Sequence, residues 1–496
     1  MVAASHPHID RGPPERGRRS FVAHATFCTR CRAMRFVRDG RTSDSCSARS
    51  SEICCSLTSS PLGSTIAHST VHLVALVLDD SDRASLNGDL GPAYRLAMRL
   101  IVRVAEAIEA EHLLDITGAH IDSCLYHGRS GLDFAERLVD AGATVKVPTT
   151  LNVSSLDLRH PDLYRGDPET ARPARRLAER YEEMGCRPTW TCAPYQLEQR
   201  PGFGEHVAWA ESNAIVFANS VLGARTDRYG DFIDICAAIT GRAPAAGLHL
   251  DANRRGELVF RLEGVSDRLL DLDVLYPVLG HLIGARTANL VPVIDGLPAR
   301  LDEDRLKALG AAAASSGSVA MFHAVGSTPE AATLDDALAG RPATETVVVT
   351  PADLRAARDQ LTTGTTTGRV GAVCVGTPHY SMSEFARLVE LIGSQRVAPG
   401  VQFFASTGRE VLTKIESRGW ADTLRDAGVQ ILTDTCTYIT PILAEVDGAA
   451  MTDSAKWAYY APGNIGVDVV FGSVEDCVAT AVTGRLVRDE AMWADA

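Results

Sequence analysis

The chain has 496 residues, 45% hydrophobic and 22% charged, which is enough for about two to four domains and too apolar for a disordered protein. Its net charge of −13 disfavours non-specific binding to nucleic acid or to an anionic membrane. No stretch approaches the roughly 18 uninterrupted apolar residues of a membrane helix.

The start of the chain, residues 1–72, differs from the rest. Residues 1–70 hold ten Arg, no Lys, five acids and five of the 12 cysteines, without a strand or helix period. They lack the apolar core of a secretory signal, and they match a transit peptide, or a metal module built on Cys28 and Cys31, only loosely. We expect a disordered extension or a wrongly assigned start.

From about residue 76, short apolar runs alternate with amphipathic helical segments. This alternation predicts an α/β fold with parallel or mixed sheets flanked by helices, and ligands then bind beyond the carboxyl ends of the strands. The chain lacks a Walker sequence and a dinucleotide glycine fingerprint, which argues against NTP or NAD binding. The predicted strands include LLDIT, TVKVPTT, AIVFANS, GLHLD, VAMFHAV, TVVVT, RVGAVCVG, VQFFAST, VQILTDT and VDVVFG.

Two motifs near the start of this region follow predicted strands. ITGAHIDSCLYHG, residues 116–128, holds five reactive side chains: His120, Asp122, Cys124, Tyr126 and His127. Their spacing matches no standard zinc site, and a polar loop explains them about equally well. VPTTLNVSS, residues 147–155, offers Thr149 and Thr150 to a carboxylate or phosphate, although turns and caps use the same residues.

A third region joins TCAPYQ, residues 191–196, to WAESNAIVFANSVLGARTDRYGD, residues 209–231. Hydrogen-bonding side chains punctuate its apolar run: Ser212, Asn219, Ser220 and Arg225. An arginine among uncharged polar groups suits a planar carboxylate, which it grips with two hydrogen bonds. A capped helix start is the alternative interpretation.

Three cysteines in the last third lie near predicted strand-to-helix turns. Cys374 falls within a strand of residues 371–384, with His379 just past it; Cys436 follows a strand, and Cys477 begins a helix. Together they offer fewer than four thiolates to an iron–sulfur cluster, which leaves an iron open as a Lewis acid. For Cys374 alone, a buried structural thiol is the favoured interpretation.

The segment TDSAKWAYYAPG, residues 452–463, carries Ser454 and Lys456. Lysine occurs only four times in the chain, which otherwise uses arginine. A lysine in a chain that mostly uses arginine suggests a role that arginine cannot fill, such as one that needs a shifted pKa.

These motifs together resemble the aconitase X family, over residues 76–487, with residues 488–496 as a tail. The matching stretches are AHIDSCLYHG, VPTTLNV, TCAPY, WAESNAIVFANSVLGART, GTPHYS, DTC and SAKWAYYAPG. The resemblance implies an aconitase-like multi-domain α/β assembly that holds an iron–sulfur cluster and dehydrates a hydroxy acid. By the same resemblance Cys436 is the firmest cluster ligand, followed by Cys477, with Cys374 and Cys124 as further candidates. Some relatives carry GCPH where this chain has Thr377, which leaves the ligand set open.

The resemblance also implies a small swivelling domain, fused or separate, that completes the site. Residues 1–70 do not resemble it, so we expect a small partner subunit or a truncated gene product. Cis-3-hydroxy-L-proline is the favoured substrate, mevalonate 5-phosphate the alternative, and a subunit that has lost its chemistry the third possibility. We expect a cytoplasmic enzyme that binds neither nucleic acid nor membrane.

Dehydration requires a fixed carboxylate, a base for the α-proton and help for the departing hydroxyl. The candidates for acid–base chemistry are Lys456, His120 and Ser454. The candidates for substrate binding are Arg225, Asn219, Ser220, Thr149, Thr150, Ser212 and His379.

Overall fold

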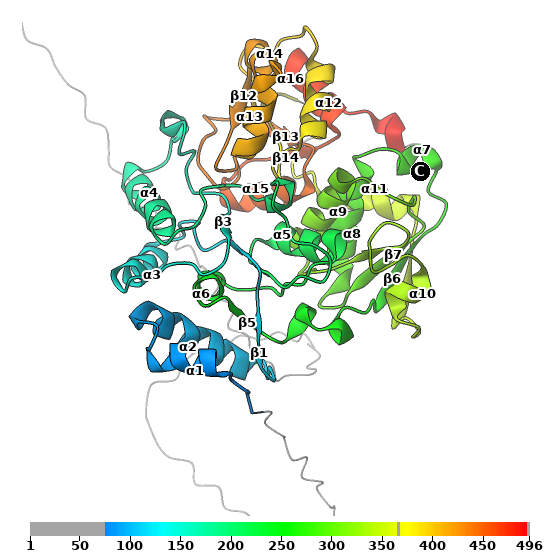
Figure 1. Ribbon diagram of the computed structural model, residues 1–496. Helices are drawn as coiled ribbons and strands as arrows, with labels where there is room; N and C mark the ends of the chain where they lie inside the picture. Colours follow the sequence, from blue (N-terminus) through cyan, green and yellow to red (C-terminus); the bar gives the residue numbers. More distant parts are fainter. Residues whose placement is uncertain (1–74, 365–367, 494–496) are drawn as a thin grey trace, which may run out of the picture. The chain divides into compact units, whose positions relative to one another are not determined.

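The computed structural model describes residues 75–364 and 368–493. The predicted extension over residues 1–72, with Cys28 and Cys31, lies outside the described residues. In the described ranges, strands and helices alternate around three parallel sheets and one antiparallel pair of strands (Figure 1). The predicted α/β class is confirmed, and no helix in these ranges is both long and apolar enough to cross a bilayer.

The three-stranded sheet belongs to the first part of the chain. Its parallel strands lie in the order β3 (Thr149–Leu151), β2 (Ala119–Ile121) and β4 (Ala208–Trp209), while β1 (Leu113–Asp115) pairs antiparallel with β5 (Arg242–Pro244). The helices of this region are α1 (Asp80–Asn87), α2 (Pro92–Ala107), α3 (Arg129–Asp140), α4 (Pro168–Glu183), α5 (Ser212–Phe217) and α6 (Ile233–Thr240). Helix α2 starts with proline at its first position and buries one apolar stripe, as an amphipathic helix on a core does.

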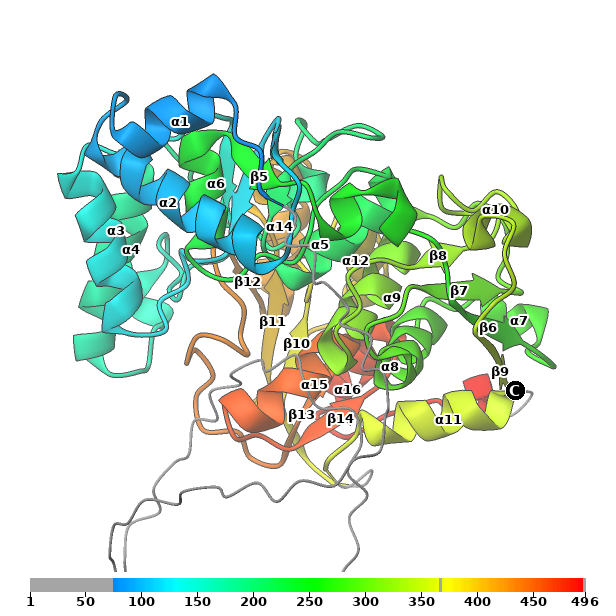
Figure 2. The same cartoon turned by 90° about the horizontal axis from the view of Figure 1, so that it is seen from below.

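The four-stranded sheet follows. Its parallel strands lie in the order β8 (His323–Ala324), β7 (Pro292–Asp295), β6 (Leu258–Leu262) and β9 (Glu345–Val349). Its helices are α7 (Asp267–Leu270), α8 (Leu275–Thr287), α9 (Glu303–Ser316), α10 (Leu334–Leu338) and α11 (Pro351–Gln360). Helices α8 and α9 lie side by side in both views (Figure 1 and Figure 2). They approach closely because Gly284 has no side chain: a Cβ there would lie 2.5 Å from the carbonyl oxygen of Ala313.

The five-stranded sheet carries the last third of the chain. Its parallel strands lie in the order β12 (Val429–Leu432), β11 (Gln402–Ser406), β10 (Val370–Val375), β13 (Ala449–Thr452) and β14 (Val469–Phe471). Its helices are α12 (Met382–Ile392), α13 (Arg409–Ser417), α14 (Trp420–Ala427), α15 (Ala455–Asn464) and α16 (Val474–Thr483). The central strand β10 is buried along its whole length, which explains why it reads as a continuous apolar run.

Two predicted strands are wrong. AIVFANS, residues 214–220, lies in helix α5 and in the π-helical turn η3 (Ala218–Leu222), and GLHLD contains the short 3₁₀ helix η4 (Gly247–His249). The side chain of Glu211 accepts a hydrogen bond from the backbone N–H of Ala214 and so begins α5. A short, wholly buried apolar run carries no period that separates strand from helix. The capped helix start is thus the correct interpretation of residues 211–217.

The predicted tail includes described residues. Its 3₁₀ helix η6 (Glu490–Trp493) buries Trp493, and the guanidinium of Arg358 lies 5.3 Å from the centre of the tryptophan ring. Glu490 also forms an ion pair with Arg358, with an Nη1–Oε2 distance of 2.8 Å. The last part of the chain that the structure describes is therefore anchored to α11.

Candidate functional site

Polar loops that follow strands of two different sheets line one cavity of about 820 Å³. From the three-stranded sheet come the segments after β2, β3 and β4; from the five-stranded sheet come the loop after β12 and helix α15, which follows β13. Both sheets present the carboxyl ends of parallel strands, where α/β proteins hold ligands. The polar lining residues include Asp122, Asn152, Cys192, Glu211, Ser212, Arg228 and Lys456.

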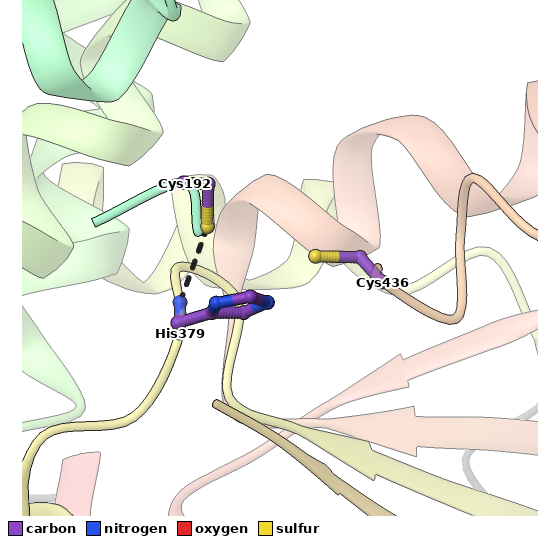
Figure 3. A group of neighbouring side chains, drawn as sticks. All are labelled: Cys192, His379 and Cys436. Atoms are coloured by element: carbon purple, nitrogen blue, oxygen red, sulfur yellow. Dashed lines mark hydrogen bonds between the residues drawn. The ribbon is translucent and has the colours of Figure 1, made fainter. Parts of the chain in front are cut away.

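Beside this cavity lies a group of three metal-ligating side chains. The Sγ atoms of Cys192 and Cys436 and a ring nitrogen of His379 all lie within 4.8 Å of one another, and all three residues are buried. Figure 3 shows the two thiols and the imidazole directed at one another from three separate loops. The backbone N–H of His379 donates a hydrogen bond of 3.3 Å to Cys192 Sγ.

The imidazole of His379 is neutral and oriented by two hydrogen bonds. Burial lowers the pKa of His379 to about 4. Its Nε2 lies 3.2 Å from the carbonyl oxygen of Thr435 and therefore carries the proton, since a carbonyl only accepts. Its Nδ1, 3.0 Å from Thr191 Oγ1, consequently accepts a hydrogen bond from that hydroxyl, which a metal at this nitrogen would have to displace.

The ionisation of each thiol depends on the other. Burial opposes ionisation of Cys192, but a hydrogen bond with Cys436 and the positive charge of Lys456 keep the pKa of Cys192 below its ordinary value. The same hydrogen bond from Cys192, together with burial, raises the pKa of Cys436 well above its ordinary value. Cys192 therefore ionises before Cys436.

A buried ion pair borders the same cavity. Lys456 Nζ lies 2.5 Å from Glu211 Oε1, and both side chains are almost fully buried. Burial alone would lower the pKa of Lys456, but Glu211 raises it well above its ordinary value. Lys456 is thus a fixed ammonium group, whose charge Glu211 balances.

The structure brings four predicted site residues to this place. Cys436 and His379 belong to the metal-ligating group, and Lys456 and Ser212 line the cavity. The hydroxyl of Ser212 donates a 3.3 Å hydrogen bond to Glu211 Oε1.

The other predicted cysteine ligands lie outside the group of three. Cys124 Sγ faces backbone carbonyls, at 3.3 Å from that of Ile121, and Cys374 and Cys477 are buried within the core of the five-stranded sheet. Burial is the largest cause of the raised pKa of each of these thiols. Their surroundings favour the neutral, structural thiol rather than a ligand.

The predicted carboxylate site does not line the cavity. Arg225 forms an ion pair with Asp251, with an Nη1–Oδ1 distance of 2.6 Å. The amide of Asn219 bonds the backbone of Thr226 and Ala320, and Ser220 Oγ accepts the N–H of Phe322. These side chains hold the turn after α5 together, because the run before them is a helix and not a strand.

The remaining candidates also make structural bonds. Thr149 Oγ1 bonds the carbonyl of Val147, and Thr150 Oγ1 lies 2.8 Å from Nδ1 of the fully buried His120. Ser454 caps helix α15 by accepting the N–H of Trp457, and its hydroxyl donates to the carbonyl oxygen of Thr377.

Sequence reasoning did not group Cys192 with the candidate metal ligands, and it did not pair Glu211 with Lys456. Both residues lie in motifs singled out from the sequence, TCAPYQ and WAESNAIVFANS. Cys192 follows no predicted strand, whereas Cys374, Cys436 and Cys477 each lie near a predicted strand-to-helix turn. Thr377 lies outside the group of three, whereas His379, two residues further along the same loop, belongs to it.

Comparison with known proteins decides the family. The chain matches the aconitase X first domain over residues 75–252, the second domain over 256–359 and the third domain over 370–483. The chain belongs to the aconitase X family. The predicted resemblance is thereby confirmed, and the three matched domains correspond to the three parallel sheets in turn.

Individual members of the family are similar over most of the chain. Cis-3-hydroxy-L-proline dehydratase of Pseudomonas aeruginosa is 45% identical over 419 residues, which cover 84% of this chain and 72% of that one. The phosphomevalonate dehydratase large subunit of Methanothermobacter thermautotrophicus is 35% identical over 79% of this chain and 96% of its own. The crystal structure of holo-form Thermococcus kodakaraensis aconitase X has a TM-score of 0.73 and 31% identity, covering 82% of this chain and 100% of that one. The two named relatives are dehydratases, so the predicted enzyme class, hydro-lyase, is confirmed.

Proposed function

We propose that the cavity beside Cys192, His379 and Cys436 is the active site of a metal-dependent hydro-lyase that dehydrates cis-3-hydroxy-L-proline or a close analogue. The observation that carries the proposal is the meeting of a Cys–His–Cys group with a buried Lys456–Glu211 pair at the edge of one cavity. The substrate assignment follows the 45% identity to the Pseudomonas aeruginosa enzyme.

The residues present fit a metal or an iron–sulfur cluster. Two thiols and an imidazole are soft to borderline ligands suited to iron or zinc, and a ring nitrogen of His379 lies within 4.8 Å of both sulfurs. Three protein ligands leave a coordination position for substrate, whereas a structural site closes all four. When bound, the metal would supply Lewis acidity for the departing hydroxyl.

The protein's own groups account for the rest of the site. Lys456 is held as an ammonium by Glu211 and faces the cavity, where it favours negative charge on a bound ligand. Glu211 is in turn fixed by the N–H of Ala214 at 2.8 Å, so the pair does not reorient when a ligand enters. Burial of both groups excludes water from this edge and strengthens the interaction.

The charges of the cavity favour an amino acid over a phosphorylated acid. In the described lining, Lys456 is already neutralised by Glu211, and Arg228 is the only other Lys or Arg. A phosphate group calls for several basic partners, as bidentate Arg–phosphate recognition illustrates. This scarcity of basic side chains supports hydroxyproline rather than mevalonate 5-phosphate.

We also propose a small partner subunit and a cytoplasmic location. The phosphomevalonate dehydratase relatives are named large subunits and are matched over nearly their whole length, 96% for the Methanothermobacter protein. The seven cysteines in the described ranges are all free thiols, which suits a reducing compartment.

The test is anaerobic purification of the full chain, alone and with a small subunit encoded beside it. Iron and sulfide are measured, and dehydration of cis-3-hydroxy-L-proline and mevalonate 5-phosphate is assayed. We expect C192A and C436A to lose metal and at least about 100-fold in activity, since even a residue that only orients a ligand is worth about 10- to 100-fold.

C186A is the matched control, because Cys186 is a buried free thiol outside the group of three. It should keep the metal. A wild-type complex without metal or activity on either compound would contradict the proposal.

A further inference from the structure

Asp122 is an acidic side chain of the cavity without a balancing positive charge. It follows β2, lines the cavity and is half-buried. The amide of Asn152 donates a hydrogen bond to its Oδ1, while its backbone N–H donates to Asp234 Oδ2 at 2.8 Å. Within the described ranges, no Lys or Arg forms an ion pair with Asp122.

Glu211, another acidic residue of the cavity lining, does have a cationic partner. Glu211 is paired with Lys456 and accepts the backbone N–H of Ala214. Asp122 has no comparable cation, and burial, followed by the charge of Glu211, raises its pKa to about 7. A carboxylate in such surroundings gains most from a positively charged ligand, because that ligand removes an unbalanced charge from a partly dry site.

Arg228 supplies the complementary charge at the same cavity. Its side chain is exposed, and its guanidinium forms no ion pair with any described residue. One unpaired carboxylate and one unpaired guanidinium on one cavity suit a zwitterion, whose ammonium and carboxylate they meet separately.

We infer that Asp122 is the specificity residue of this site and accepts the ring ammonium of a cyclic amino acid substrate. The inference rests on the proposed function and deepens it, because it names the group that separates a hydroxyproline from a hydroxy acid without nitrogen. Asn152 positions the carboxylate, and Arg228 faces the substrate carboxylate. A phosphorylated hydroxy acid offers Asp122 only negative charge, so the same residue rejects it.

The test compares two ligands that differ in the charge of one ring atom. L-proline carries a ring ammonium, whereas (S)-tetrahydrofuran-2-carboxylate has an uncharged oxygen there, and neither has the hydroxyl that is eliminated. Binding to the metal-loaded full chain, with its small subunit where one is required, is measured by titration calorimetry at pH 8. We expect the wild type to bind L-proline roughly ten- to hundredfold more tightly, the range of a charge-assisted hydrogen bond.

In D122N this preference should shrink to about threefold or less, with binding of the oxygen analogue changed by no more than that. D122E should keep most of the preference for L-proline. The control D447N removes a carboxylate that is exposed and pairs with Arg369, and it should behave as the wild type. Thermal melting of each variant shows that the fold is intact.

The inference is overturned if the wild type does not prefer L-proline over the oxygen analogue. It is also overturned if D122N keeps the full preference for L-proline, or if a D122E protein of normal melting temperature loses most of it. The proposed function fails by a different result, namely a metal-loaded complex that dehydrates neither hydroxy acid. Because calorimetry needs no turnover, the two failures are distinguishable.

Discussion

At the scale of single residues, burial decides which polar groups are available for chemistry. His120 lies within β2, the strand that Asp122 follows, and is fully buried against Trp209, with 5.9 Å between the ring centres. Thr150 Oγ1 faces its Nδ1, and its Nε2 has no partner among the described residues. Burial keeps this histidine in its neutral form, which makes the folded state sensitive to acid.

The pH dependence of stability follows from that burial. Desolvation lowers the pKa of His120 to about 3, while an unfolded histidine titrates near 6.5. Below about pH 6.5 the unfolded chain therefore binds a proton that the folded chain excludes, and the free energy of unfolding falls as the pH drops toward 3. Each pH unit in that window costs up to about 1.4 kcal/mol.

Replacing His120 with glutamine should reduce this loss of stability at acid pH. Urea unfolding of H120Q and wild type is measured at pH 7.5, 6, 5 and 4. As the pH drops, the free energy of unfolding should fall further below its value at pH 7.5 in the wild type than in H120Q. Equal slopes for both proteins would show that His120 does not titrate on unfolding.

At the scale of elements, strand ends and helix caps place the site. Ser454 caps α15, which carries Lys456, and also bonds the carbonyl of Thr377 in the loop that carries His379. It therefore ties the cavity lysine to the metal-ligating loop. Ser473 caps α16 with a capping box, but it lies outside the cavity and outside the group of three.

S454A should lower the free energy of unfolding by about 1 kcal/mol, the usual effect of a lost N-cap, and should also lower kcat. S473A should cost a similar amount of stability without changing kcat, because its helix carries no residue of the site. Chemical denaturation and steady-state kinetics on both variants separate the two effects. Equal kinetics for S454A and S473A would limit Ser454 to an ordinary cap.

The same reasoning about elements shows what the sequence could predict. His379, Cys436 and Lys456 each follow a strand of a parallel sheet, so the strand pattern alone places them near one edge. Arg225 and Asn219 do not line the cavity, because residues 214–220 form a buried helix and not the strand that the pattern predicted. Cys192 lies in a loop after no strand, and its neighbours Cys436 and His379 are distant in sequence. No local spacing encodes that contact, since only the packing of two sheets creates it.

At the scale of the whole molecule, the candidate site lies where loops of two different sheets meet. Gln196 Nε2 donates to the carbonyl of His379 at 3.0 Å, and the N–H of Ser154 donates to the carbonyl of Asp434 at 2.6 Å. These bonds connect loops of the first part of the chain with loops of the last third. The group of three is divided in the same way, since Cys192 comes from the first and His379 and Cys436 from the last.

A metal bound by this group should therefore link the stability of both parts. A ligand that binds only the folded state stabilises it by about 2.7 kcal/mol at 100 times its Kd, and the ligand set here exists only when the two sheets are docked. Removing the metal with a chelator should lower the Tm of the wild type, and adding iron under anaerobic conditions should restore it. The doubly substituted C192A/C436A should melt at the same temperature with and without chelator, whereas C186A should respond as the wild type does. A chelator effect of equal size on C192A/C436A would place the stabilising metal elsewhere in the protein.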